Sequence, residues 1–374
     1  MIDYLDTIPY LLLLGLLMIN MKINSKASNN LCFFIIFIFS AIRYNVGFDF
    51  MMYLDILKND PYYDRFEFFE YLLQRLAAET YIPLFFIINS FITVYFVKGA
   101  IENLSTNVSI SLFAFFCIPL LYTHSFSIIR FWAGVSILFY GSTFLFKKKW
   151  IHFAIFYVIS IFFHGSMIIG ILFVPLILFN VSRIVNILCL IISFIGGEFV
   201  LSQIMQGSLM DYKLLGGDRF MRYANLAITG DAMTKLPYVY LAIDIIFFIL
   251  WPRTTKRHDK TSCKTLKDRN SATKDRNSAT CKKYITLYNV GVCILFLLSF
   301  DTTLNTRLCR PFLVYIILLI PLILQRFRLL NRQLATFAFT LAASALFIYT
   351  ITIYNDTLGK SEYLPYRIIF LENY

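Results

Sequence analysis

The side chains with the clearest chemical potential in this 374-residue sequence are cations at the ends of long apolar runs. Arg43 ends the second run, Arg130 begins the fifth, His164 ends the sixth, and Arg307 and Arg310 precede the eleventh. A guanidinium is planar, stays protonated and matches phosphate oxygens with paired N–H donors. The set therefore predicts a phosphate or pyrophosphate site. The alternative for any single arginine is extension to the headgroup region, or an ion pair with a carboxylate.

Proton transfer has fewer candidates. Asp49, in the segment VGFDF, could deprotonate a sugar hydroxyl, but it could equally pair with Arg43 or form a turn. His164, in FFHGS, could hydrogen-bond phosphate or sugar, act as a base, or be a structural group at a helix end. Asp244 and Glu198 lie in or near apolar runs, where an ionisable side chain is a functional candidate. The residue types leave these alternatives open.

The sequence has none of the motifs that carry nucleotide, metalloprotease or serine-hydrolase chemistry. It contains no Walker loop, GxGxxG, HExxH or GxSxG. Its seven cysteines include no CxxC pair, which argues against a zinc site and against disulfides. We therefore predict no metal, no cofactor and no nucleic-acid partner.

The elements that must position these residues are membrane helices. Hydrophobic residues make up 59% of the chain and charged residues 15%, against about 25% charged in soluble proteins. The apolar runs cover residues 8–21, 31–46, 82–98, 108–124, 128–146, 150–163, 166–179, 184–200, 236–251, 284–300, 311–324 and 334–354. The sequence predicts an all-α polytopic membrane protein with about twelve transmembrane helices, forming a single transmembrane domain over residues 1–374.

Basic residues are concentrated in alternate loops, such as those holding Lys147, Lys148, Lys149 and the 252–283 segment. Loops rich in Lys and Arg stay in the cytoplasm, so both termini are predicted to be periplasmic, and the net charge of +12 mainly reports topology. Counted from the basic residue at the inner end of each helix, the arginines and the histidine lie about 15–19 residues away, roughly 22–29 Å along a helix. That length places them together at the outer membrane boundary.

Two long loops are predicted on the periplasmic side. Residues 47–81 include an amphipathic stretch that predicts a helix lying at the membrane interface, its apolar face formed by Phe66, Phe69, Leu73 and Leu76. Residues 201–235 are rich in glycine and charge, and supply candidate loop contacts at Arg219, Arg222 and Tyr223.

The 252–283 segment carries the heptad KDRNSAT twice in succession. Identical polar heptads without apolar periodicity bury nothing, so the segment is predicted to be a mobile basic cytoplasmic loop. It serves either as a topology anchor or as a contact for anionic lipid or a cytoplasmic partner.

Several short motifs, in order along the chain, resemble those of the EpsG family, which includes Wzy-type O-antigen and capsule polymerases. Residues 41–50 (AIRYNVGFDF), followed by Tyr53, resemble its R-Y-x-V-G-x-D-Y signature. Residues 129–134 (IRFWAG) resemble its I-R-Q-x-x-A element, and 163–166 (FHGS) match F-H-x-S. Arg307, Arg310 and the late segment Leu364-Pro365-Tyr366-Arg367 stand where such proteins carry Arg and P-Y. The sequence departs from the pattern at Phe48, Phe131 and Trp132, which puts substrate details in question more than the class.

The resemblance implies a glycosyltransferase of the bacterial inner membrane whose active site faces the periplasm. It would transfer the growing glycan from undecaprenyl pyrophosphate to the non-reducing-end sugar of a new lipid-linked repeat unit. A chain-length regulator is an expected protein partner. Read with the residues above, this reaction has pyrophosphate clamped by Arg43, Arg130 and Arg307 with support from Arg310, and the acceptor oriented or deprotonated by His164 or Asp49. The alternatives are a lipid-linked oligosaccharide flippase and a membrane O-acyltransferase.

Overall fold

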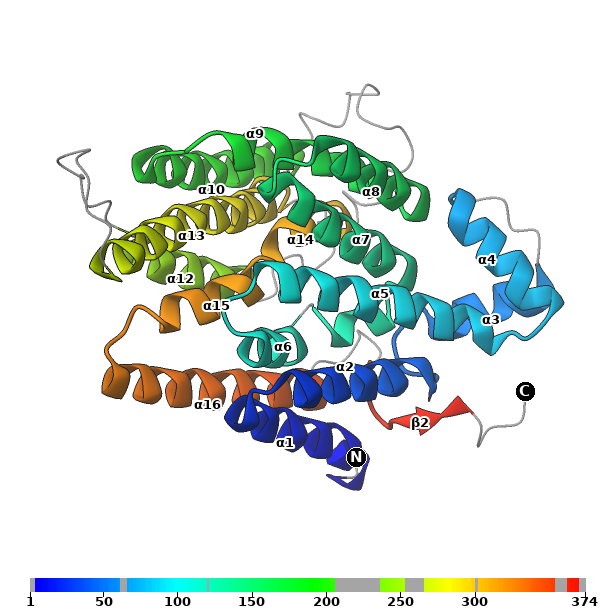
Figure 1. The fold of residues 1–374 in the computed structure, drawn as a ribbon. Coiled ribbons are helices and arrows are strands. Elements are labelled where there is room, and N and C mark those ends of the chain that lie inside the picture. The colour runs from blue at the N-terminus through cyan, green and yellow to red at the C-terminus, as the bar shows by residue number, and fades with distance from the viewer. Residues whose placement is uncertain are drawn as a thin grey trace. The chain divides into compact units, whose positions relative to one another are not determined.

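The computed structural model describes residues 4–60, 66–119, 121–205, 236–252, 266–299, 302–353 and 362–369, which are mostly helical (Figure 1). The elements in chain order are η1 (Tyr4–Thr7), α1 (Ile8–Ile23), α2 (Lys26–Ala41), β1 (Arg43–Tyr44), α3 (Phe50–Asn59), α4 (Phe68–Glu79), α5 (Pro83–Leu104), α6 (Val108–Cys117), η2 (Thr123–Phe126), α7 (Ile129–Phe146), α8 (Trp150–Phe163), η3 (Gly165–Leu172), α9 (Phe173–Leu178), α10 (Arg183–Met205), α12 (Leu236–Ile249), α13 (Leu266–Leu297), α14 (Thr302–Leu313), α15 (Ile316–Leu324), α16 (Leu329–Ile353) and β2 (Arg367–Ile368).

Each of the twelve predicted apolar runs overlaps a helix. Within the described residues, five helices have the length and composition to cross a membrane: Leu5–Ile23, Pro83–Leu104, Ile129–Phe146, Leu304–Leu324 and Leu329–Thr352. Other apolar runs give shorter helices, because the helix ends before the apolar run does. The run 108–124, for example, is helical only to Cys117, two residues before Pro119, as expected where a proline disfavours helical backbone at the residue before it. The chain is therefore a helical membrane protein.

The chain divides into two compact units. Unit 1 comprises Met1–Gly170 and Ile320–Tyr374, and unit 2 comprises Ile171–Leu319, so η3 and α15 each cross the division. In unit 1, α5 packs against α2 and α7, α7 packs against α8, and α1 packs against α6 and α2.

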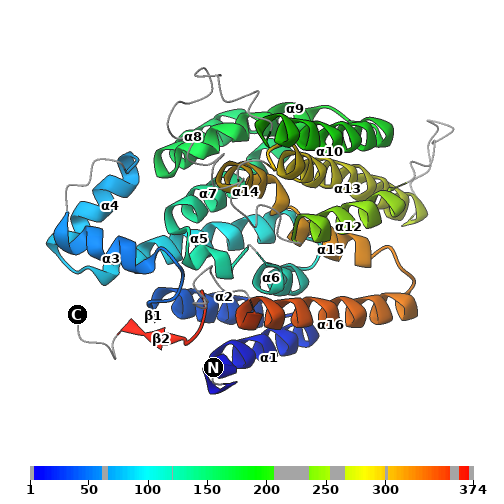
Figure 2. The ribbon, with the colours of Figure 1, turned by 180° about the vertical axis from the view of Figure 1, so that it is seen from behind.

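A two-stranded antiparallel pair joins distant parts of unit 1. Arg43 lies opposite Ile368 and Tyr44 opposite Arg367, so β1, directly after α2, pairs with β2 near the C-terminus (Figure 2). Ile369 N donates to Ile42 O at 2.7 Å and extends this contact. The pairing brings the late segment 362–369 onto the loop that follows α2.

The amphipathic helix predicted in the 47–81 loop forms as α4, but its faces differ from the prediction. Its buried residues are Glu70, Leu73, Gln74 and Ala77. Large apolar side chains lie on the other side, where Phe68, Leu72 and Leu76 are 56%, 46% and 48% exposed; we call these three the outer face of α4. The buried face is thus half polar, and a helix with large apolar side chains on its exposed side is suited to a lipid interface.

In unit 2, α10, α12 and α14 pack against α13. Arg307 and Arg310 lie within α14, near the start of the candidate span Leu304–Leu324, so helix forms before the predicted apolar run 311–324 begins. The segment 252–283, predicted to be a loop, is helical from Leu266 onward as the first part of α13.

Candidate functional site

Arg130 is the centre of a small polar cluster in unit 1. It lies in the first turn of α7, and its side chain is 18% exposed. Its Nη1 is 2.6 Å from Glu67 Oε2, its Nε donates to Tyr53 Oη at 3.4 Å, and its guanidinium carbon lies 4.0 Å from the centre of the Phe66 ring. We call Tyr53, Phe66, Glu67 and Arg130 the Arg130 cluster. It holds a partly exposed guanidinium against an acidic partner and an aromatic face.

Glu67 connects this cluster to His164. Glu67 occupies the N-cap position of α4 but makes no side-chain cap bond. Instead its Oε1 accepts a hydrogen bond from Gly165 N at 2.9 Å, at the residue after His164. The side chain of Glu67 is 28% exposed. One carboxylate thus binds Arg130 and the backbone N–H next to His164, two residues that the sequence singled out separately.

His164 ends α8 and is 7% exposed. Its Nδ1 accepts a hydrogen bond from Ser166 N at 3.2 Å, and its ring meets the Phe131 ring edge-on with centroids 5.3 Å apart. Gly134 lets α7 approach α8 closely, since a Cβ there would lie 3.2 Å from Ser160 O and 3.4 Å from His164 Cβ. Helix packing therefore fixes the imidazole beside the start of α7.

A second carboxyl group, Glu70, lies on the buried face of α4. It is fully buried, and Asn89 Nδ2 donates to its Oε2 at 3.3 Å. Burial raises the pKa of Glu70 to about 8, with the positive charge of Arg130 acting in the opposite direction. The two carboxyl groups therefore differ in environment: Glu67 forms the ion pair with Arg130, whereas Glu70 is buried against Asn89.

Arg43 lies in a different environment from Arg130. It is 1% exposed, and none of the three ion pairs among the described residues includes it. Its Nη1 donates to Ser40 O and to Ser90 Oγ (3.3 Å), and its Nη2 donates to Phe126 O (3.3 Å), whose ring centre lies 4.7 Å from the guanidinium carbon. We call Ser40, Arg43, Ser90 and Phe126 the Arg43 cluster.

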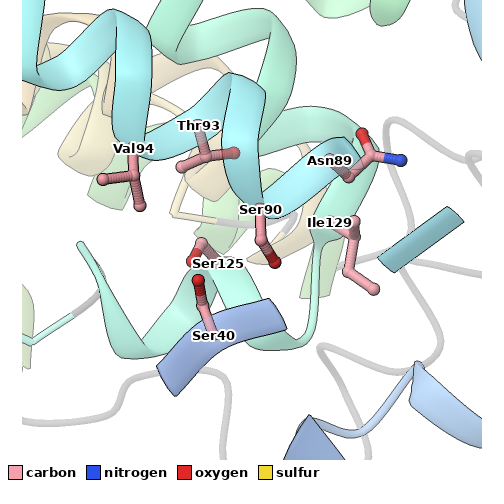
Figure 3. Close-up of a pocket in the computed structure, with 7 residues that line it drawn as sticks. All are labelled: Ser40, Asn89, Ser90, Thr93, Val94, Ser125 and Ile129. Carbon is pink, nitrogen blue, oxygen red and sulfur yellow. The ribbon is translucent and has the colours of Figure 1, made fainter. Parts of the chain in front are cut away.

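A narrow polar hollow adjoins the Arg43 cluster (Figure 3). It is too constricted for a water molecule and is lined by Ser40, Asn89, Ser90, Thr93, Val94, Ser125 and Ile129. Asn89, at its rim, is the residue that also donates to Glu70. Hydroxyl and amide groups on α5 therefore run from the Arg43 cluster to the buried carboxyl group of α4.

The loop after Arg43 has tight steric demands. Gly47 has φ of +98°, and a Cβ there would lie 2.3 Å from Phe126 O, so only glycine fits. Gly47 N donates to Glu362 O at 2.8 Å, and Phe48 N donates to Ser127 Oγ at 3.0 Å. These bonds attach the loop to the residues just before α7 and to the late segment 362–369.

Asp49 begins α3 at the N-cap position, partly exposed and without a side-chain cap bond. It lies one helical turn before Tyr53, and its charge adds to the effect of burial in raising the Tyr53 pKa. Asp49 is therefore near the Arg130 cluster.

Two of the remaining predicted site residues belong to unit 2. Arg310 is 1% exposed in α14, with Arg307, partly exposed, one turn before it, and both belong to unit 2. Arg219, Arg222 and Tyr223 lie outside the described residues. Within unit 1 the structure brings Arg130, His164 and Asp49 into one neighbourhood and gives Arg43 a separate, buried set of contacts.

Unit 2 also contains the buried carboxylate predicted from its position in an apolar run. Asp244 is fully buried in α12, and Asn289 Nδ2 donates to its Oδ2 at 2.8 Å. Asn289 in turn contacts Cys293 Sγ at 3.7 Å. In the described part of the chain, no three His, Cys, Asp or Glu side chains are placed to hold a metal ion.

Sequence reasoning missed Glu67 and Glu70. Both belong to the stretch RFEFFEY, where the apolar period suggested only an interfacial helix. The available signal was the position of Glu67 just before the helix, where an acidic side chain is free to reach a neighbouring element.

A family model for the EpsG family matches residues 27–368. The search of curated proteins and the search of solved structures returned no match. The match spans nearly the whole chain and includes the Arg43 loop, the start of α7 and the end of α8. The chain belongs to the EpsG family and is a membrane protein of polysaccharide biosynthesis.

Proposed function

We propose that the protein is a glycosyltransferase that polymerises oligosaccharide repeat units carried on undecaprenyl pyrophosphate. The observation that carries the proposal is the Arg130 cluster. A guanidinium at the end of a membrane helix, partly exposed and paired with a single carboxylate 2.6 Å away, can exchange that carboxylate for a phosphate oxygen. Family membership makes a polysaccharide precursor the relevant substrate class.

The chemistry needs little besides positioned charge. The acceptor hydroxyl attacks the anomeric carbon of the donor glycan, and the bond from that carbon to the pyrophosphate oxygen breaks. The leaving group keeps the bonding electrons, so negative charge grows on the phosphate oxygens. A preplaced guanidinium stabilises that charge without having to reorganise. Removing one such donor typically lowers the reaction rate by a factor of about 10²–10³.

Arg130 is the proposed first ligand of the pyrophosphate. His164 or Asp49 orients or deprotonates the acceptor sugar. His164 directly precedes Gly165, whose N–H donates to Glu67. Arg43, Arg307 and Arg310 complete the predicted set of cations, and Arg219, Arg222 and Tyr223 contact the sugars from the 201–235 loop. No nucleotide is required, because the lipid pyrophosphate is itself the leaving group.

The proposed setting is the bacterial inner membrane, with about twelve spans, both termini and the site on the periplasmic side, and the basic segment 252–283 in the cytoplasm. The outer face of α4 supports a site at the membrane interface. Its apolar side chains are exposed on the helix whose N-cap residue, Glu67, belongs to the Arg130 cluster. A chain-length regulator is the proposed protein partner.

The test is the surface-polysaccharide ladder on a gel from a strain deleted for this gene, with and without the gene restored. Collapse to a single repeat unit, with the ladder returning on complementation, supports polymerisation. An unchanged ladder contradicts it. Loss of even the single-repeat band indicates a flippase, and normal chain length with altered acetylation indicates an O-acyltransferase; both outcomes overturn the proposal.

A further inference from the structure

The ion pair with Glu67 occupies the guanidinium of Arg130, which the proposed function assigns to a phosphate oxygen. The pair is the shortest contact of the Arg130 cluster, at 2.6 Å, and both side chains are partly open to the outside. Glu67 has a second anchor in Gly165 N, at 2.9 Å from its other oxygen. The carboxylate can therefore lose one partner while the other holds it in place.

The surroundings of Glu67 make the exchange selective for that oxygen. Arg130 is fixed from its far side by Tyr53 Oη and by the Phe66 ring, so the guanidinium stays where it is when its acidic partner leaves. Glu70 is fully buried and has its own donor in Asn89. Glu67 Oε2 is thus the atom that an incoming phosphate oxygen replaces.

We infer that Glu67 is a placeholder for the phosphate on Arg130 and that, once displaced by the donor's pyrophosphate, it becomes the base that accepts the proton of the acceptor hydroxyl. This inference rests on the proposed function. While Glu67 bridges Arg130 and Gly165, both of its oxygens are engaged. Pyrophosphate frees Oε2 beside the reacting centre, so the base is available only when the donor is bound.

The step balances without a further reactant. The acceptor O–H bond breaks and its proton moves to Glu67 Oε2, while a bond forms from the acceptor oxygen to the anomeric carbon. The bond from that carbon to the pyrophosphate oxygen breaks, and the pyrophosphate leaves with the electron pair. Glu67 then gives its proton to water, and the ion pair with Arg130 re-forms when the pyrophosphate departs. His164 and Asp49 act in this scheme as orienting groups.

The experiment separates binding from turnover in the full-length protein. Glu67→Gln removes the proton acceptor but keeps a group that can accept from Gly165 N, and Glu79→Gln, in the exposed pair with Arg75 on the same helix, is the matched control. Farnesyl diphosphate binding, followed by thermal shift on purified protein, is expected to be about two- to fivefold tighter in Glu67→Gln, because a competing carboxylate has gone. Polymer formation is expected to fall by at least about 100-fold. Glu79→Gln changes neither.

Polymer at the wild-type level in Glu67→Gln overturns the base role, and joint loss of diphosphate binding and polymer overturns the placeholder role. If Glu67→Gln does not accumulate, Glu67→Ala is assayed with added formate: restored polymer supports the base role, and a folded but unrescued protein contradicts it. Failure of the proposed function is separate, because it appears as an unchanged ladder on deletion of the gene, whatever residue 67 is.

Discussion

The Arg130 and Arg43 clusters hold the same functional group in two ways. Arg130 has an acidic partner and an 18% exposed side chain, whereas Arg43 is 1% exposed and donates to two backbone carbonyls and one hydroxyl. The neutral partners of Arg43 come from α2, α5 and η2, so Arg43 holds these three elements together. A single charged partner at an open edge makes Arg130 exchangeable. Two arginines that look equivalent in sequence thus differ in what their removal should do.

The largest expected effect comes from Arg130→Ala. We expect polymer to fall by about 10²–10³-fold, because the developing phosphate charge loses its preplaced guanidinium. The protein level is expected to stay normal, since an ion pair with partly exposed side chains contributes only about 0–1 kcal/mol to stability. The measurement is a polysaccharide ladder alongside an immunoblot. The control is Arg75→Ala on α4, and a full ladder in Arg130→Ala would remove Arg130 from the site.

Arg43→Ala is expected to act mainly on stability. Deleting a buried guanidinium with three hydrogen bonds destabilises the fold by on the order of 3 kcal/mol, so the protein level and the melting temperature in detergent should drop. Polymer per folded molecule should fall less than in Arg130→Ala. If Arg43→Ala instead accumulates normally and makes no polymer, Arg43 acts on substrate directly and the contrast between the two clusters fails.

The pH dependence of stability should distinguish Glu70 from its neighbours. Its pKa in the folded state, about 8, lies above the ordinary value of 4.5, so the folded protein binds this proton more tightly than the unfolded chain does. The resulting stabilisation is complete below pH 4.5 and is lost as the pH rises to about 8. Glu70→Gln carries no such proton. Its melting temperature relative to the wild type should therefore rise between pH 5 and pH 8.5, and a constant difference would contradict the buried, neutral carboxyl group.

A pair of conservative changes gives the smallest effects. Ser90→Ala removes one donor contact of Arg43 and should cost about 1 kcal/mol of stability with little change in polymer.

Tyr53→Phe removes the 3.4 Å contact of Arg130 and should lower polymer a fewfold, at unchanged melting temperature. Melting curves and initial rates on the two variants check both statements. The reverse pattern would exchange the roles of the clusters.

The sequence predicted the helical membrane architecture and the family, because apolar runs and short ordered motifs are local properties. It also pointed to Arg130 and His164, which the structure connects through Glu67. Local patterns could not predict Glu67 itself, since its role depends on α4 meeting the junction of α8 and η3. Nor could they predict the neutral surroundings of Arg43, which come from residues as far apart as Ser40 and Phe126. The burial of Glu70 and Gln74 on α4 could not be predicted for the same reason.

The strand pairing of Arg43 with Ile368 has a consequence for biogenesis. A ribosome delivers α1, α2 and η2 to the membrane early, but the segment 362–369 that supplies Glu362 O to Gly47 and Tyr363 O to Tyr10 is synthesised hundreds of residues later. Until then, the loop carrying the family signature lacks its cover. A truncation before residue 362 keeps α1, α2 and η2 but removes the acceptors of Gly47 N and Tyr10 Oη, so this loop stays uncovered.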